Sequence, residues 1–191
     1  MSTENLVTGN AARGKILLAL ARAAIARAFG QTAQADESAP WLREAGATFV
    51  TLTQDGELRG CIGSLEAHRP LVDDVKANAL AAAFRDPRFP PLLESELART
   101  SVEVSLLSPM QEIAFLDEAD ARAQLRPGID GVVLEYGWQR GTFLPQVWEQ
   151  LPQRAQFLAH LKKKAGLPAD FWADEVRLYR YSVEKWKEEN P

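Results

Sequence analysis

Two runs of residues typical of β-strands flank the dipeptide Asp55-Gly56, and this pattern constrains the fold more than any other in the chain. Residues 48–53 are rich in β-branched and aromatic side chains, and residues 57–62 continue the apolar pattern after the dipeptide. Asp-Gly favours the left-handed backbone of a two-residue hairpin turn. The sequence therefore predicts an antiparallel hairpin at this point.

The predicted turn also sets a register between the two strands. With two residues in the loop, Leu52 lies opposite Arg59 and Val50 lies opposite Cys61. A change of one residue in the loop length would turn every side chain of the second strand to the other face. The pattern therefore leaves open whether Cys61 faces the core or a cleft.

The second strand ends in the sequence Leu-Arg-Gly-Cys-Ile-Gly at residues 58–63, which contains the only cysteine of the chain. In a strand, Arg59 and Cys61 would share a face about 6.6 Å apart, and a cation at this distance favours a reactive thiolate. Both are candidate catalytic residues, and the alternative is a cysteine that only packs. Gly60 and Gly63 interrupt the strand, as glycines do where a bulge, a backbone or a ligand comes close, so both are candidate ligand-binding residues.

A loop fixed by prolines follows the predicted helix at residues 70–84. Residues 85–91 hold three prolines within five positions, which force an extended path, and the loop carries Arg85, Asp86 and Arg88. One interpretation is an anion-binding surface that uses the two arginines. The other is a solvated connector with one internal ion pair.

Three further residues complete the set of candidates. Arg140 and Thr142 flank a glycine, so this stretch again places an arginine beside a flexible backbone, and both are candidate ligand-binding residues. Glu103 lies on a predicted strand with alternating polar and apolar residues. It is the best carboxylate for acid/base or orienting work, and it would lie near Arg59 if their strands were neighbours.

The remaining pattern mixes helices and strands without regular βαβ alternation, which favours an α+β fold with a mostly antiparallel sheet flanked by helices. No linker or repeat divides residues 1–191, so we expect a single domain with a larger part and a smaller subdomain. The other predicted elements are helices at residues 13–29, 117–125 and 152–165 and strands at 101–107, 132–134 and 176–183.

Composition narrows the classes of protein that fit. The net charge of −4 argues against a dedicated nucleic-acid binder, although it allows a basic patch. A single cysteine excludes an intrachain disulfide, and residues 1–10 lack an apolar signal core, so we expect a reducing, cytoplasmic location and no membrane span. The chain has no phosphate-binding glycine loop and no cysteine pair, and its two histidines are far apart, so we expect neither a cofactor nor a metal.

Several stretches occur in an order that resembles the AMMECR domain family, whose prokaryotic members are called AmmeMemoRadiSam system protein A. They are LRGCIG at residues 58–63, FRDPRFPPL at 84–92, SVEVSLLSP at 101–109 and RGTFLPQVWEQL at 140–151. The resemblance runs from the first predicted helix to the last predicted strand. It implies an α+β fold with a larger and a smaller subdomain, and a cleft shared by the first, second and fourth stretches.

The resemblance also implies partners and a role. Relatives occur beside Memo-like proteins and radical SAM proteins, for which nucleic-acid or nucleobase modification has been proposed. We therefore expect an accessory or binding component of such a pathway, acting through a cleft around Arg59-Gly60-Cys61, with an anionic small molecule as a second type of ligand. The alternative is an enzyme that uses Cys61 as a nucleophile or thiol carrier on an anionic small molecule or a nucleobase.

Overall fold

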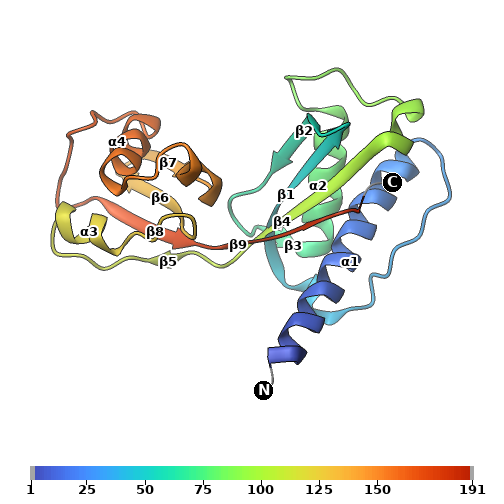
Figure 1. Ribbon diagram of the computed structural model, residues 1–191, viewed down its shortest axis with the longest axis horizontal. Helices are drawn as coiled ribbons and strands as arrows, with labels where there is room; N and C mark the ends of the chain where they lie inside the picture. Colours follow the sequence, from blue (N-terminus) through green and yellow to red (C-terminus); the bar gives the residue numbers. More distant parts are fainter. Residues whose placement is uncertain (1–2, 190–191) are drawn as a thin grey trace. The chain divides into compact units, whose positions relative to one another are not determined.

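The computed structural model describes residues 3–189 and combines helices with antiparallel sheets, which confirms the predicted α+β class (Figure 1). The chain divides into two compact units, which are described one at a time. The larger unit comprises the residues up to Leu107 together with those from Glu184 onward, and the smaller unit comprises Ser108–Val183. Within residues 3–189, no helix is long and apolar enough to cross a membrane.

The larger unit is built on one sheet with the strand order β2-β1-β4-β9, in which β3 pairs with β1 outside this path. Its strands are β1 (Ala45–Gln54), β2 (Glu57–Gly63), β3 (Arg69–Pro70), β4 (Thr100–Leu107) and β9 (Val183–Lys187). Its helices are α1 (Thr3–Ala28) and α2 (Leu71–Phe84), and the short 3-10 helices are η1 (Pro40–Arg43) and η2 (Glu94–Arg99). β2 therefore forms an edge of the sheet.

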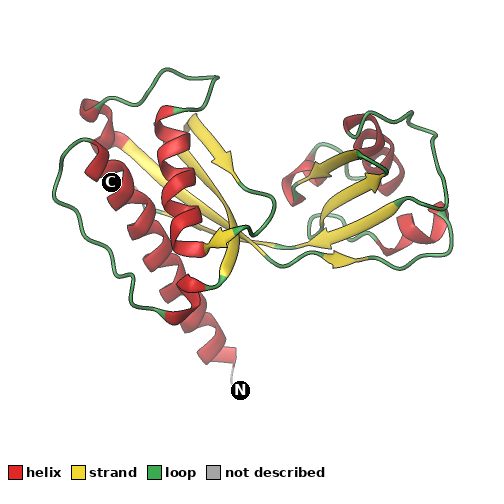
Figure 2. Cartoon of the chain, turned by 180° about the vertical axis from the view of Figure 1, so that it is seen from behind, coloured by secondary structure: helices red, strands yellow, loops and turns green. Residues whose placement is uncertain are grey.

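The core of the larger unit lies between the sheet and the two long helices. α1 and α2 lie side by side and contact β4 and β1 (Figure 2). Alternate residues of β1 and β4 are fully buried and belong to the same apolar cluster as the helices; they are Val50, Leu52, Val102 and Val104. The residues between them point to the opposite face of the sheet.

The hairpin turn forms where the sequence predicts it. Asp55 and Gly56 have positive φ angles of 51° and 85°, as a two-residue turn with two left-handed residues requires. The strands on either side pair antiparallel, beginning with Gln54 opposite Glu57. This part of the expectation is confirmed.

The predicted register beyond the turn is wrong by one residue. A β-bulge interrupts the pairing between Thr53 and Leu52, on the side away from the turn. As a result, Leu52 lies opposite Gly60 and Thr51 lies opposite Cys61. Arg59 is the extra residue on β2. Because the bulge inserts one residue into a single strand, it changes all later pairings without changing the turn.

The smaller unit has its own sheet and its own core. The strand order is β5-β8-β6-β7, all antiparallel, and its core includes the stacked rings of Trp148 and Phe157, 3.6 Å apart. The elements are β5 (Gln111–Glu112), α3 (Glu118–Gln124), β6 (Gly131–Tyr136), β7 (Gln139–Phe143), η3 (Pro145–Glu149), α4 (Arg154–Lys164) and β8 (Arg177–Tyr181).

Candidate functional site

Cys61 lies on β2 with its side chain half-buried. The Oγ1 hydroxyl of Thr51 on the neighbouring strand donates to its Sγ atom at 3.2 Å. Thr51 is also the register partner of Glu103 on β4, so Cys61, Thr51 and Glu103 form one row across three strands. This row contains neither Val50 nor Leu52, and it points away from the helices.

The outer edge of β2 is covered at Cys61 by side chains of the proline-rich loop. The backbone N–H of Cys61 donates to Oδ2 of Asp86 at 2.8 Å, and the carbonyl of Cys61 accepts from Nη2 of Arg88 at 3.2 Å. Both backbone groups that an added strand would use are therefore occupied. Asp86 and Arg88 anchor the loop to the strand and fix the backbone that carries the thiol.

Asp86 and Arg88 also bind each other. The Asp86 side chain is only 1% exposed, whereas that of Arg88 is 54% exposed, and Nε and Nη2 of Arg88 donate to the carboxylate at 2.9 and 2.7 Å. The Arg88 side chain, with the N–H of Cys61, holds the pKa of Asp86 well below its ordinary value of 3.8. The pKa of Arg88 is raised, mainly by its hydrogen bond to Asp86 and also by the charge of that carboxylate. The loop thus contains the internal ion pair that the second interpretation expected.

Arg59 has a different partner from the one that its position in the sequence indicated. Its Nη2 forms an ion pair with Glu96 at 3.1 Å and donates to the carbonyl of Pro91 at 3.3 Å, and the residue is only 9% exposed. Arg59 is the main cause of a fall in the pKa of Glu96 from 4.5 to about 2. Among the described residues, the side chains that contact Cys61 through polar atoms are Thr51, Asp86 and Arg88.

Glu103 is half-buried on β4, and β1 lies between its strand and β2. The condition under which Glu103 would lie near Arg59, that their strands are neighbours, is therefore not met. Two strand spacings place it about 10 Å from Cys61 along the row, which is too far for direct proton transfer. Within residues 3–189 its side chain has no hydrogen bond or ion pair, so it stays available to an incoming group.

Close packing accounts for both glycines of this stretch. A Cβ atom at Gly60 would lie 2.2 Å from the backbone oxygen of Ala82 in α2, and one at Gly63 would lie 2.2 Å from the Phe49 ring. The sheet and the helix thus need these positions free of side chains, whether or not a ligand binds. Arg85, by contrast, is exposed at the end of α2, and its side chain has no polar partner in the part of the chain that the structure describes.

The remaining two candidates belong to the smaller unit. Arg140 on β7 pairs through Nε with Glu135 at 3.0 Å. The Oγ1 of Thr142 lies 3.2 Å from the hydroxyl of Tyr181, which donates to the carbonyl of Phe143 at 3.1 Å. Burial raises the pKa of Tyr181. That these residues line one cleft with Cys61 stays a prediction.

A buried polar cluster in the larger unit was missed by the sequence analysis. Asp74 is buried, with only 1% of the residue exposed. Its carboxylate accepts hydrogen bonds at 2.7–2.9 Å from Thr48, Ser64, Arg69 and Asn78. The available signal was a polar pair four residues apart, Asp74 and Asn78, beside the apolar stripe of α2. All these donors are satisfied within the protein, so the cluster joins α2 to β1 and stabilises the fold. In residues 3–189, no group of three or more His, Cys, Asp or Glu side chains could hold a metal ion.

Comparison with known proteins extends these observations. The model of the AMMECR1 family matches residues 18–186. A protein from Methanothermobacter thermautotrophicus is 39% identical over 181 residues, covering 92% of this chain and 94% of the relative. A protein from Thermotoga maritima is 40% identical over 164 residues, covering 83% of this chain and 88% of the relative. The crystal structure of an uncharacterised protein from Pyrococcus horikoshii superimposes with a TM-score of 0.78 at 35% identity, covering 93% of this chain and 92% of the other.

Proposed function

This chain belongs to the AMMECR1 family, and on that premise we propose that it is an accessory binding component of a modification pathway that includes a Memo-like protein and a radical SAM protein. The pathway and its partners come from the resemblance of the four sequence stretches. The proposed contact region is the Cys61 surface, defined here as Cys61, Thr51, Asp86 and Arg88.

The observation that carries this proposal is the double attachment of the Cys61 backbone. Asp86 and Arg88 hold its N–H and its carbonyl, while about half of the Arg88 side chain stays exposed. An arginine held in place by a buried carboxylate loses little conformational freedom when a partner binds it. Nε and Nη2 of Arg88 are used by Asp86 and the Cys61 carbonyl, so Nη1 is the group left to donate to a carboxylate or phosphate of the partner.

The surroundings of Cys61 favour binding over catalysis. A cysteine nucleophile is ordinarily activated by an adjacent base, and in residues 3–189 no histidine forms a hydrogen bond with Cys61. His68 instead pairs with Glu66 at 3.0 Å. Glu103 is two strands away from Cys61.

We expect Arg88→Gln to weaken binding to the purified Memo-like or radical SAM protein of the same organism by about tenfold or more. Cys61→Ser should leave the affinity within about threefold, because the hydroxyl keeps the size and the hydrogen bond of the thiol. The measurement is biolayer interferometry with the full chain immobilised, after circular dichroism has shown that each variant is folded.

Arg99→Gln is the matched control, because Arg99 is similarly exposed at 60% and lies in the same unit on η2. It should bind like the unmodified chain. Absence of a complex at concentrations on the order of 50 μM would contradict the proposal. An equal loss of affinity in the Arg99 and Arg88 variants would show general electrostatic attraction and would contradict the assigned surface.

One observation favours the enzyme alternative, in which Cys61 acts on an anionic small molecule or a nucleobase. The Thr51 hydroxyl donates to Sγ, and the Arg88 guanidinium donates to the carbonyl of the same residue. Both groups lie beside Cys61, where they could orient a substrate against Sγ.

Alkylation of Cys61 separates the two functions, and the chain offers a single thiol to measure. For a binding surface, we expect iodoacetamide to react more slowly with the native chain than with the urea-unfolded chain at both about pH 6 and about pH 8, because Sγ is half-buried. For an enzyme, the native chain should react faster than the unfolded chain at about pH 6. Arg88→Gln should then remove that excess rate.

A further inference from the structure

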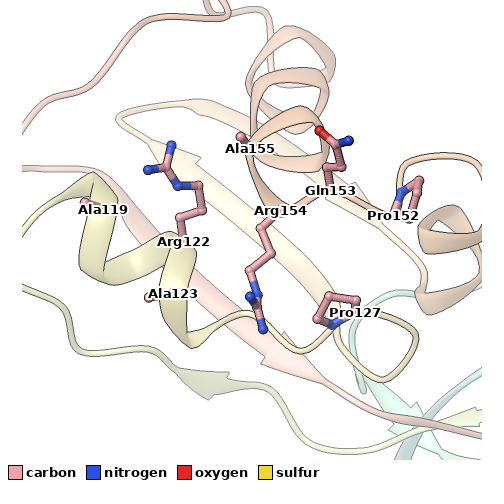
Figure 3. Close-up of a pocket in the computed structure, with 8 residues that line it drawn as sticks. All are labelled: Ala119, Arg122, Ala123, Pro127, Pro152, Gln153, Arg154 and Ala155. Carbon is pink, nitrogen blue, oxygen red and sulfur yellow. The ribbon is translucent and has the colours of Figure 1, made fainter.

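A pocket of about 390 Å³ lies in the smaller unit between α3 and the beginning of α4 (Figure 3). It combines three aliphatic side chains, two prolines, one amide and two arginines. Its lining residues are Ala119, Arg122, Ala123, Pro127, Pro152, Gln153, Arg154 and Ala155. None of the Cys61 surface residues belongs to it, so a ligand in this pocket would be independent of the proposed function.

The charge of the pocket is positive and is not balanced within it. Two of the eight lining residues are arginines, and none is acidic. The side chain of Arg122 has no hydrogen bond or ion pair within the described range 3–189. Arg154 uses its Nε to donate to the carbonyl of Leu125 at 2.7 Å, which fixes its direction and leaves its terminal amino groups for another acceptor. The positive charge of the two guanidinium groups favours an anion in the hollow.

The two arginines approach the hollow from different helices. Figure 3 shows Arg122 extending from α3 and Arg154 extending from the beginning of α4 toward the loop at Pro127. The first turn of α4 adds backbone N–H groups, because Gln153 makes no side-chain cap and the turn contains no acidic residue. The positive end of the α4 dipole lies at this turn and adds to the positive charge of the two arginines.

The size and the walls of the pocket restrict the ligand further. Seven of the eight lining residues are exposed, so this is an open surface hollow, and its volume leaves room for more than an inorganic anion. Alanine and proline side chains form much of its wall and would contact an apolar group. A phosphate monoester carries about two negative charges and three acceptor oxygens at neutral pH, which matches two arginines and a set of backbone donors better than a carboxylate does.

We propose that this pocket binds the phosphate monoester of a small organic molecule, with Arg122 and Arg154 holding the phosphate and the alanines and prolines contacting the organic group. The probe is phenyl phosphate, compared with inorganic phosphate and benzoate at constant ionic strength. Amide chemical shifts of the full chain, recorded in nitrogen-15 NMR titrations, report both the affinity and the place of binding.

We expect saturable shifts for residues 119–127 and 152–157 with phenyl phosphate, and weaker binding of the other two probes. Arg122→Gln should weaken phenyl phosphate binding about tenfold to a hundredfold, the usual effect of losing a charge-assisted hydrogen bond. It should fold normally, since the Arg122 side chain has no partner among the described residues, and the dispersion of its amide spectrum checks this. Arg122→Glu should abolish binding.

Lys163→Gln is the matched control, since it removes one positive charge from the exposed last turn of the same helix as Arg154. It should bind phenyl phosphate like the unmodified chain. No saturable shift up to about 10 mM phenyl phosphate, or equal affinity of the Arg122→Gln and unmodified chains, would overturn the proposal. Equal affinity for benzoate would overturn the assignment to phosphate, and equal affinity for inorganic phosphate would overturn the assignment to an ester.

Discussion

Gly60→Ala is expected to lower the free energy of unfolding by about 3 kcal/mol, near the upper end of what overpacking a core costs. The new Cβ atom would lie 2.2 Å from the carbonyl oxygen of Ala82 and 3.1 Å from its carbonyl carbon. Both are backbone atoms in the last turns of α2, so no side-chain rotation can relieve the clash. Either β2 or α2 must shift, and urea denaturation followed by circular dichroism measures the cost.

Gly56→Ala is the control for the general effect of replacing a glycine in this hairpin. Gly56 has a positive φ of 85° and open space around the position of a Cβ atom, so only the backbone penalty of about 1 kcal/mol applies. If Gly60→Ala costs no more than Gly56→Ala, the close contact between β2 and α2 is contradicted. The glycine at this position would then need another cause, such as the close approach of a ligand.

The hairpin shows which part of the fold can be predicted from sequence. The turn depends on the conformational preference of Asp55 and Gly56 themselves, and that preference is local. The bulge after Thr53 depends on packing, because Gly60 must face the backbone of α2 while Arg59 reaches Glu96 on η2. No pattern within residues 48–63 contains that information, so the register was predicted wrongly although the turn was right.

The candidate site likewise has a part that the sequence predicts and a part that depends on the tertiary structure. The unusual composition of residues 58–63 and of the proline-rich loop identified Cys61 and Arg88 as candidates. The hydrogen bond from the Cys61 backbone to Asp86 joins residues that lie 25 positions apart, and β-strand periodicity carries no signal for it. The sequence placed Arg59 beside the thiol because i and i+2 of a strand share a face, whereas the fold pairs Arg59 with Glu96 and places Arg88 at the carbonyl of Cys61.

The pocket in the smaller unit was not predicted because its two arginines belong to separate helices. Arg122 and Arg154 each read as an ordinary surface residue of a predicted helix. What distinguishes them is the absence of an acidic residue from the lining of the pocket. That property belongs to the tertiary arrangement of α3 and α4, so a sequence pattern could not have shown it.

Asp86→Asn is expected to lower the free energy of unfolding by about 2 kcal/mol, as the loss of hydrogen bonds to a buried charged group does. The Asp86 carboxylate accepts from the backbone N–H groups of Cys61 and Arg88 at 2.8 and 3.1 Å, and from the Arg88 side chain. An amide supplies one acceptor oxygen and brings an NH2 group against these donors. Asp73→Asn is the control, because Asp73 is exposed in the first turn of α2 and should change the stability by about 0.5 kcal/mol or less.

The same substitution should also change how stability depends on pH. The pKa of Asp86 is lower in the folded protein than its ordinary value of 3.8, so protonation favours the unfolded chain. The contribution of the carboxylate is complete above about pH 5 and is lost as the pH falls through 3.8 toward the lower folded value. Glu96 acts in the same direction in both proteins, so its effect cancels in the comparison. Between about pH 5 and pH 3, the Asp86→Asn variant should therefore lose less stability than the unmodified chain. Urea denaturation at these pH values measures both losses. If the two chains lose the same amount of stability, Asp86 is not the buried, paired carboxylate described here.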